Sequence, residues 1–79
     1  MKILKRAGRQ QPTKLQKRVA SISTPELIMW AENALFVIGK ELTHHQKDRN
    51  IDALSEAEMG AEALLAITQE IKKRASNEF

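Results

Sequence analysis

The residues of this sequence that are best suited to chemistry lie at positions 41–45, which read Glu-Leu-Thr-His-His. The Glu-x-x-His spacing puts a carboxylate and an imidazole on one side of a helical turn, as in di-iron carboxylate bundles. A second helix could add the carboxylates of Glu56, Glu58 or Glu62. A pattern of one Glu and one His often arises by chance, however, and histidines near a helix C-terminus are favourable simply as partial cations. A metal-binding helical bundle is therefore a remote alternative, and we predict no metal ligands and no cofactor.

Catalytic residues are even less evident. Glu41 with His44 or His45 is the one acid–base pair that the spacing suggests, and a solvated helix end explains these residues better. The sequence has no Gly-rich phosphate-binding loop. It also has no cysteine, so a thiol nucleophile, a disulfide and a thiolate metal site are excluded. We therefore expect a protein without enzymatic activity and predict no catalytic residues.

The charge of the chain is unevenly distributed. Residues 1–23 contain seven of the 13 basic side chains and none of the ten acids, so this basic arm carries +7. Residues 24–79 carry the other six basic side chains and all ten acids, which makes −4. Such an arm would bind the phosphates of RNA or DNA, or an acidic protein surface, including this protein's own acids. It holds no aromatic residue, which argues against stacking on single-stranded bases. The predicted contacts are Lys5, Arg6, Arg9, Lys14, Lys17 and Arg18.

The strongest signal for secondary structure lies at residues 23–26, which read Ser-Thr-Pro-Glu. Thr24 suits the N-cap of a helix, Pro25 its first turn, and Glu26 the positive end of its dipole. A helix is predicted over about residues 25–45, because apolar residues then recur at three- and four-residue spacing. The apolar stripe comprises Leu27, Ala31, Ala34, Leu35, Ile38 and Leu42, flanked by Ile28, Trp30 and Val37.

A second helix is predicted over about residues 52–75. Asp52 is the preferred N-cap, and the capping-box sequence at residues 55–58 is a later alternative start. Acids gather near the beginning of this helix and basic residues near its end, as the helix dipole favours, and Glu70 has an i,i+4 partner in Arg74. The apolar face is rich in small residues, which let two helix axes approach closely. It comprises Ala57, Gly60, Ala61, Leu64, Ile67, Thr68 and Ile71.

These signals together predict an all-α fold. The two long helices should form an antiparallel hairpin, because the connection between them is short. Leu42 and Ile38 should then lie opposite Ala57, Gly60 and Ala61. Trp30 should lie near Ile67 and Ile71. A capping-box pattern at residues 13–16 and apolar residues at i, i+4 and i+7 indicate a short basic helix over residues 14–22. We accordingly divide the chain into the basic arm, residues 1–23, and a helical hairpin, residues 24–79.

A hairpin of this length has too small an apolar core to be stable as an isolated monomer. Met29 and Phe36 lie one heptad apart on the side of the first long helix opposite its stripe, and Met59, Ala63 and Ala66 form a similar line on the second. Two interpretations stay open: the arm helix covers part of this surface, or a second copy or another protein does, giving a larger helical bundle. For a protein contact, the predicted anchors are Met29, Trp30, Phe36 and Val37.

The favoured interpretation is a small non-enzymatic interaction protein. Its hairpin docks on a protein partner or on a copy of itself, while its basic arm contacts an acidic surface. The alternative is a nucleic-acid-binding regulator, in which a dimeric helical bundle presents basic arms to phosphates. The apolar runs at residues 27–31 and 34–38 are far shorter than the roughly 20 residues that span a bilayer, so no membrane span is expected. The charged start of the chain does not resemble a secretory signal, and we expect a cytoplasmic location.

Overall fold

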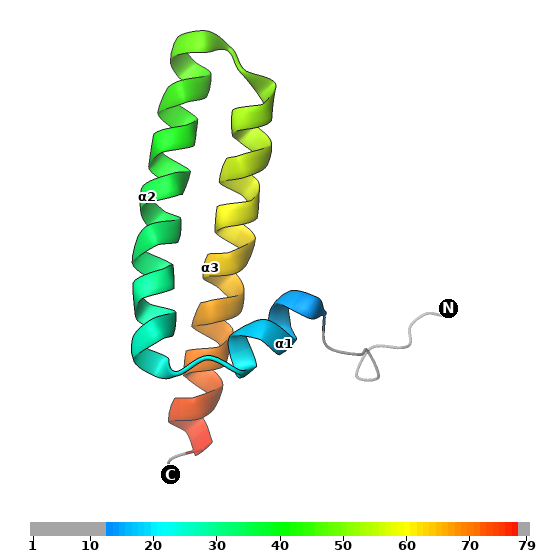
Figure 1. Ribbon diagram of the computed structural model, residues 1–79, viewed down its shortest axis with the longest axis vertical. Coiled ribbons are helices and arrows are strands. Elements are labelled where there is room, and N and C mark those ends of the chain that lie inside the picture. Colours follow the sequence, from blue (N-terminus) through cyan, green and yellow to red (C-terminus); the bar gives the residue numbers. More distant parts are fainter. Residues whose placement is uncertain (1–12, 78–79) are drawn as a thin grey trace, which may run out of the picture.

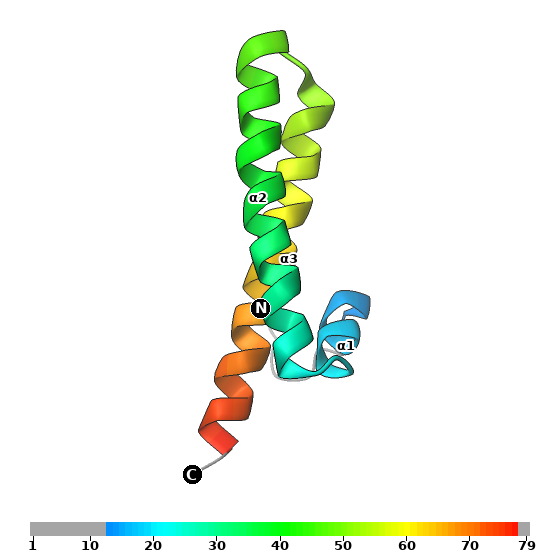
Figure 2. The ribbon, with the colours of Figure 1, turned by 60° about the vertical axis from the view of Figure 1, so that its left-hand side comes forward.

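In the computed structural model, which describes residues 13–77, the chain forms three helices: α1 (Lys14–Ala20), α2 (Thr24–Asp48) and α3 (Ile51–Asn77). Helices α2 and α3 run side by side in opposite directions, and α1 packs against the C-terminal half of α3 (Figure 1). Figure 2 shows that α1 projects to one side of this pair. The described residues contain no strand. The predicted all-α class is confirmed, but the two-helix description is incomplete, because α1 is a third helix that packs on α3.

Helix α1 begins with the capping box that its sequence predicts. Thr13 Oγ1 accepts a hydrogen bond from the Gln16 backbone N–H at 3.0 Å, and Gln16 Oε1 accepts one from the Thr13 N–H at 2.9 Å. The helix ends at Ala20, two residues before the predicted end. The reason is that the N–H and the hydroxyl of Ser21 both donate to the carbonyl of Arg18, at 3.1 and 2.8 Å, and close the last turn there.

Helix α2 begins one residue earlier than predicted. Its N-cap is Ser23, whose Oγ accepts a hydrogen bond from the Glu26 backbone N–H at 3.4 Å, so the prediction of Thr24 as N-cap was wrong. Thr24 already lies in the helix, and its hydroxyl oxygen accepts a hydrogen bond from Arg74 at 2.8 Å. The side chain of Thr24 therefore contacts a residue 50 positions away instead of capping the helix.

The connection between α2 and α3 is only two residues long. Arg49 adopts the left-handed conformation (φ 55°), and its N–H donates to the carbonyl of His45 at 2.7 Å, which ends α2. The side chain of Asn50 then accepts a hydrogen bond from the Asp52 N–H at 2.9 Å. Asn50 therefore caps α3 in place of the predicted Asp52, and the capping-box sequence at residues 55–58 lies inside the helix. Because the connection is so short, α3 must return along α2.

The two long helices meet along a seam of residues spaced alternately three and four apart, the repeat of a coiled coil. On α2 the seam follows Leu27, Ala31, Ala34 and Ile38, and on α3 it follows Ala53, Ala57, Gly60, Leu64, Ile67 and Ile71; all of these side chains are buried or partly buried. Half of these residues are Ala or Gly, and the helices approach closely as expected. A Cβ built on Gly60 would lie 3.0 Å from Cγ1 of Ile38, which confirms the predicted contact between these residues.

Four residues predicted to lie on the apolar stripes are instead exposed. Leu35 and Leu42 of α2 are 58% and 49% exposed, and Ala61 and Thr68 of α3 also face solvent. A seam with an average period of 3.5 residues is narrower than the stripe drawn on a straight helix, and it leaves these flanking positions outside. On α3, Ala63 and Ala66 are buried instead.

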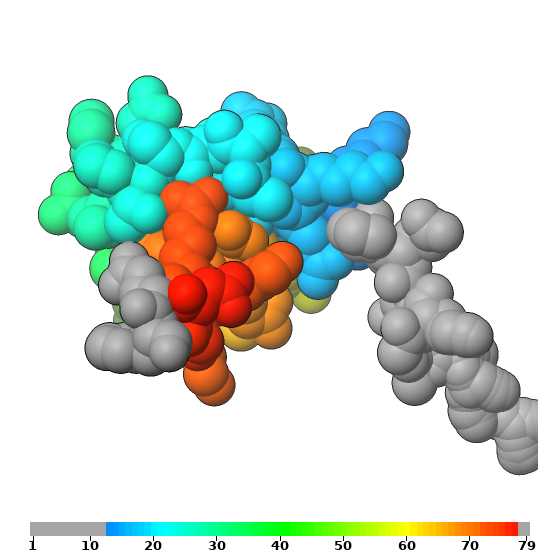
Figure 3. Space-filling view, turned by 90° about the horizontal axis from the view of Figure 1, so that it is seen from below, coloured from blue at the N-terminus to red at the C-terminus, as the bar shows by residue number. Residues whose placement is uncertain are grey.

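The largest buried side chains lie where all three helices meet. Val19 of α1, Leu27 of α2, and Ala66 and Ile67 of α3 form one cluster, which confirms the interpretation that the arm helix covers part of the hairpin. The partly buried residues around this cluster are Leu15, Ile22, Trp30, Ala31 and Ile71, so Trp30 does lie near Ile67 and Ile71. Figure 3 shows the α1–α2 connection (cyan) lying against the C-terminal part of α3 (orange).

Replacing Gly60 by Leu is expected to lower the free energy of unfolding by about 2–3 kcal/mol. The new Cβ would meet Cγ1 of Ile38 at 3.0 Å and the carbonyl oxygen of Ala34 at 3.5 Å, and the rest of the side chain would force the helices apart. Denaturant unfolding followed by circular dichroism measures the change. The matched control is Gly39→Ala, where the Cβ has no neighbour within 4 Å. This control should stabilise the helix by about 0.5–1 kcal/mol, and equal effects at the two glycines would contradict the close approach of α2 and α3.

Candidate interaction surfaces

The side of α2 that points away from α3 carries an unusual number of exposed apolar residues. They are Ile28 (48% exposed), Met29 (67%), Leu35 (58%), Phe36 (67%) and Leu42 (49%). Together with Glu32, Gly39 and Thr43 they fall within an arc of about 140° on the helix, and we call these eight residues the outer face of α2. Glu32 is the only charged residue of the outer face. The inner seam of α2 is also apolar, and it adjoins the outer face where Ala31 lies next to Leu42, so α2 is apolar over more than half of its circumference.

A shallow hollow of about 530 Å³ lies in the middle of the outer face. It is lined by Leu35, Phe36, Gly39, Lys40 and Thr43. The hollow exists because Gly39 has no side chain and nothing else comes within 4 Å of the position that a Cβ would take. A large side chain from a partner helix would fit into such a hollow between residues one turn apart.

Of the four residues predicted to anchor a protein contact, the structure leaves two exposed and places two in partly buried positions. Met29 and Phe36 lie on the outer face and are exposed, as their position opposite the stripe predicts. Trp30 and Val37 are partly buried. Trp30 packs against the core cluster, and the guanidinium of Arg18 lies 5.3 Å from the centre of its ring. Trp30 therefore serves the core and a cation–π contact with α1.

Three residues of the outer face were assigned by the sequence to the inner stripe or its flank: Ile28, Leu35 and Leu42. They follow one another at intervals of seven residues. Met29 and Phe36 are also seven residues apart. Two such rows side by side indicate a second apolar line on the helix. Because α2 has more apolar residues than one seam can bury, the sequence does not indicate which line faces α3.

The basic residues predicted to contact an acidic partner are partly described by the structure. Lys14, Lys17 and Arg18 are exposed on α1, whereas Lys5, Arg6 and Arg9 lie outside the described residues. Within residues 13–77, the ion pairs do not include Lys14, Lys17 or Arg18, so these cations do not bind the acids of α3 there.

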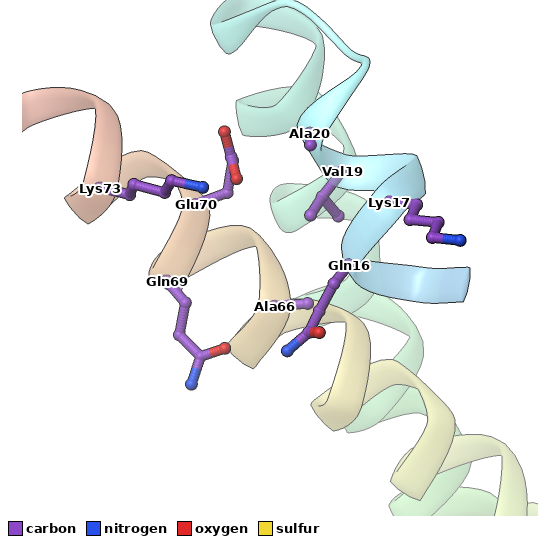
Figure 4. A pocket seen from close by; sticks show the side chains of 8 residues that line it. All are labelled: Gln16, Lys17, Val19, Ala20, Ala66, Gln69, Glu70 and Lys73. Atoms are coloured by element: carbon purple, nitrogen blue, oxygen red, sulfur yellow. The ribbon is translucent and has the colours of Figure 1, made fainter. Parts of the chain in front are cut away.

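A pocket of about 340 Å³ between α1 and α3 is lined by residues of both helices, among them one lysine from each. Figure 4 shows Lys73 at one edge and Lys17 at the other, with Val19 and Ala66 between them. The remaining lining residues are Gln16, Ala20, Gln69 and Glu70. The sequence predicted Lys73 only as a favourable charge at a helix end. Its position beside α1 follows from the docking of α1 on α3.

The residues of α2 considered for metal binding or acid–base chemistry are engaged in contacts at the end of that helix, whereas the carboxylates considered on the second long helix, Glu56, Glu58 and Glu62, are exposed on α3. His44 Nδ1 lies 3.5 Å from Oε1 of Glu41, and His44 Nε2 lies 3.0 Å from Oδ2 of Asp48. The other histidine, His45, has Nδ1 3.1 Å from the carbonyl oxygen of Asn50. In the described part of the chain, no three His, Asp or Glu side chains are placed to hold one metal ion.

Arg74 has a role that the sequence revealed only in part. The predicted pair with Glu70 is present, with Nε 2.9 Å from Oε2. The same guanidinium also donates to Thr24 Oγ1 at 2.8 Å and to the carbonyl of Ile22 at 2.7 Å. Longer hydrogen bonds, at 3.2 and 3.4 Å, reach the carbonyls of Val19 and Ala20. Arg74 therefore fastens the α1–α2 connection to α3.

Charged residues interrupt both long helices, and within residues 13–77 neither these helices nor α1 has the length and apolar character needed to cross a membrane. The surfaces that remain for interaction are the outer face of α2 and the basic residues around α1. In comparisons with protein-family models, with curated proteins and with solved structures, no match to this chain was found.

Proposed function

We propose that this protein is a small non-enzymatic interaction module, in which the outer face of α2 binds a protein and the basic arm contacts an acidic surface. The observation that carries the proposal is the row of five large exposed apolar side chains on the outer face. Their exposed area is roughly 500 Å², within the range of the functional patches found on small monomers. Burying this area against a partner is favourable by about 25 cal/mol for each Å².

The charges on α1 support the second part of the proposal. Lys14, Lys17 and Arg18 are exposed within five residues, and Arg18 is held against the ring of Trp30. Cations grouped in this way attract an acidic surface over about 10 Å at moderate ionic strength and speed the encounter with it. The basic arm would thus bring the partner close, and the outer face would supply the contact that holds it.

The second candidate function is a nucleic-acid-binding regulator. The observation that favours it is the pocket between α1 and α3, which is edged by Lys17 and Lys73. Ammonium groups on two helices can neutralise phosphates along one backbone, which would give binding that depends strongly on salt and little on base sequence.

Affinity capture with the full chain as bait distinguishes these functions. The bait is used as wild type, as Leu35→Glu on the outer face, and as Lys14→Glu with Lys17→Glu on α1. Under the proposed function, a bound protein is lost with Leu35→Glu, and its retention by the Lys variant is weaker and less sensitive to salt. Mass spectrometry and a nucleic-acid stain of the eluates identify what is bound.

The control bait is Leu65→Glu, because Leu65 is a leucine on α3 that is as exposed as Leu35. It should retain the same partner as the wild type. If the eluate holds nucleic acid that is lost with the Lys variant but kept with Leu35→Glu, the regulator is the correct function. Retention that no variant alters would contradict both.

A further inference from the structure

We infer that the partner of the outer face is a second copy of this chain, bound through the same face with the two α2 helices antiparallel. The two-fold axis runs midway between the two α2 helices, perpendicular to the plane that contains them, at the level between Leu35 and Phe36. This inference rests on the proposed function and names the partner of the same surface. Two hairpins joined in this way form a four-helix bundle with α2 and its copy at the centre and the α3 helices outside.

The first argument is that the outer face is complementary to itself. In an antiparallel pair with this axis, each residue before Leu35 lies level with a residue the same number of positions after Phe36 in the second copy. Leu35 lies beside Leu35 of the second copy above the plane of the two α2 helices. Phe36 lies beside Phe36 of the second copy below that plane. Further along, Ile28 lies beside Leu42 of the second copy. All of these side chains are about half or more exposed in the single chain.

The second argument concerns the one charge on the outer face. In the same register, Glu32 lies level with Gly39 of the second copy, where nothing stands within 4 Å of the missing Cβ. The carboxylate therefore has space. The neighbouring residue of that copy is Lys40, whose Nζ lies 3.6 Å from Oε2 of Glu41 in its own chain. Its side chain is 58% exposed and is long enough to turn from Glu41 to the carboxylate of Glu32. Two-fold symmetry forms this ion pair twice, so that the arrangement joins opposite charges as well as apolar rows.

The third argument is the size of the contact. The five apolar side chains expose roughly 100 Å² each, so two copies would bury about 1,000 Å² from these residues alone. That area reaches the lower limit of specific protein interfaces. Dimerisation would also enlarge the small apolar core of the single chain, because the inner and outer faces of α2 are then both buried.

Disulfide trapping tests this geometry directly, because the chain contains no cysteine of its own. Under mild oxidation, Leu35→Cys and Phe36→Cys should each give a covalent dimer of the full chain. A mixture of Ile28→Cys and Leu42→Cys should give the mixed dimer in preference to either symmetrical one, which reports the antiparallel register. Leu65→Cys, at an equally exposed site on α3, should give no covalent dimer.

Sedimentation of the purified chain provides the second measurement. The wild type should sediment at twice the 8.9 kDa of one chain, and Leu35→Glu should weaken dimerisation by more than about tenfold, because it buries a carboxylate without a partner. Glu32→Lys and Lys40→Glu should each weaken the dimer, and the two together should restore it. Circular dichroism verifies that each variant is as helical as the wild type.

The outcomes separate this inference from the proposed function. A wild-type chain that stays monomeric while Leu35→Glu loses a captured protein overturns the second copy and leaves the proposed function intact. A monomer that also loses no partner with Leu35→Glu overturns both. A dimer that persists in Leu35→Glu, or that is trapped through Leu65→Cys, overturns the inference, since the copies then meet elsewhere.

Discussion

Replacing Leu27 by Ala is expected to lower the free energy of unfolding by about 3–4 kcal/mol. The side chain of Leu27 is fully buried at the junction of the three helices, against Val19 of α1 and Ile67 of α3. Removing it leaves a cavity that rigid helices on three sides cannot fill. A domain of this size is stable by only about 4–12 kcal/mol in total, so the variant should lose a large fraction of its stability.

Urea unfolding followed by circular dichroism measures this loss. The matched control is Leu65→Ala, which removes the same atoms from a leucine of α3 that is 58% exposed. It should change the stability by no more than about 0.5 kcal/mol. Similar losses at Leu27 and Leu65 would show that the three helices do not share the core described above.

Replacing Arg74 by Ala should cost about 3 kcal/mol and should release α1 from α3. The substitution removes hydrogen bonds to Thr24 and to the carbonyl of Ile22, among others, and leaves Glu70 without its cation. The single tryptophan of the chain, Trp30, reports the release, because it packs against the core cluster and under Arg18 of α1. Its fluorescence should shift towards that of a solvated indole before the hairpin itself unfolds.

Two further variants identify the cause of this effect. Arg74→Lys keeps the charge but cannot reach Glu70, Thr24 and the backbone carbonyls at once, so it should recover less than half of the loss. Lys73→Ala, at the exposed neighbouring position, should leave both stability and fluorescence near the wild type. If Arg74→Lys restored full stability, the charge alone, and not the branched geometry of the guanidinium, would hold the connection.

The two surfaces of the proposed module differ in how far the sequence predicted them. The basic residues of α1 are evident from the sequence, because a run of cations without acids shows in the order of the residues. For the outer face of α2, the sequence indicated Met29 and Phe36 but assigned Leu35 and Leu42 to the core. With Ile28, which was placed on the flank of the stripe, three of the five exposed apolar residues of this surface were assigned to the inner side of the helix.

The sequence by itself determined the features that depend on residues close together in the chain. The three helices, the capping box of α1, the pair between Glu70 and Arg74, and the short antiparallel connection all follow from residues at most a few positions apart. Hydrogen bonds between nearby groups and apolar periodicity specify these features before any long-range contact forms.

Only the tertiary structure decided which side of α2 faces α3, which partner the side chain of Thr24 has, and where α1 lies. A helix that is apolar around most of its circumference has two candidate inner faces, and the small residues of α3 select the one that lets the helices approach to the distance seen at Gly60. The hydroxyl of Thr24, the residue predicted to cap α2, instead accepts a hydrogen bond from Arg74, 50 residues away. These choices depend on groups brought together by packing, and no local pattern of the chain encodes them.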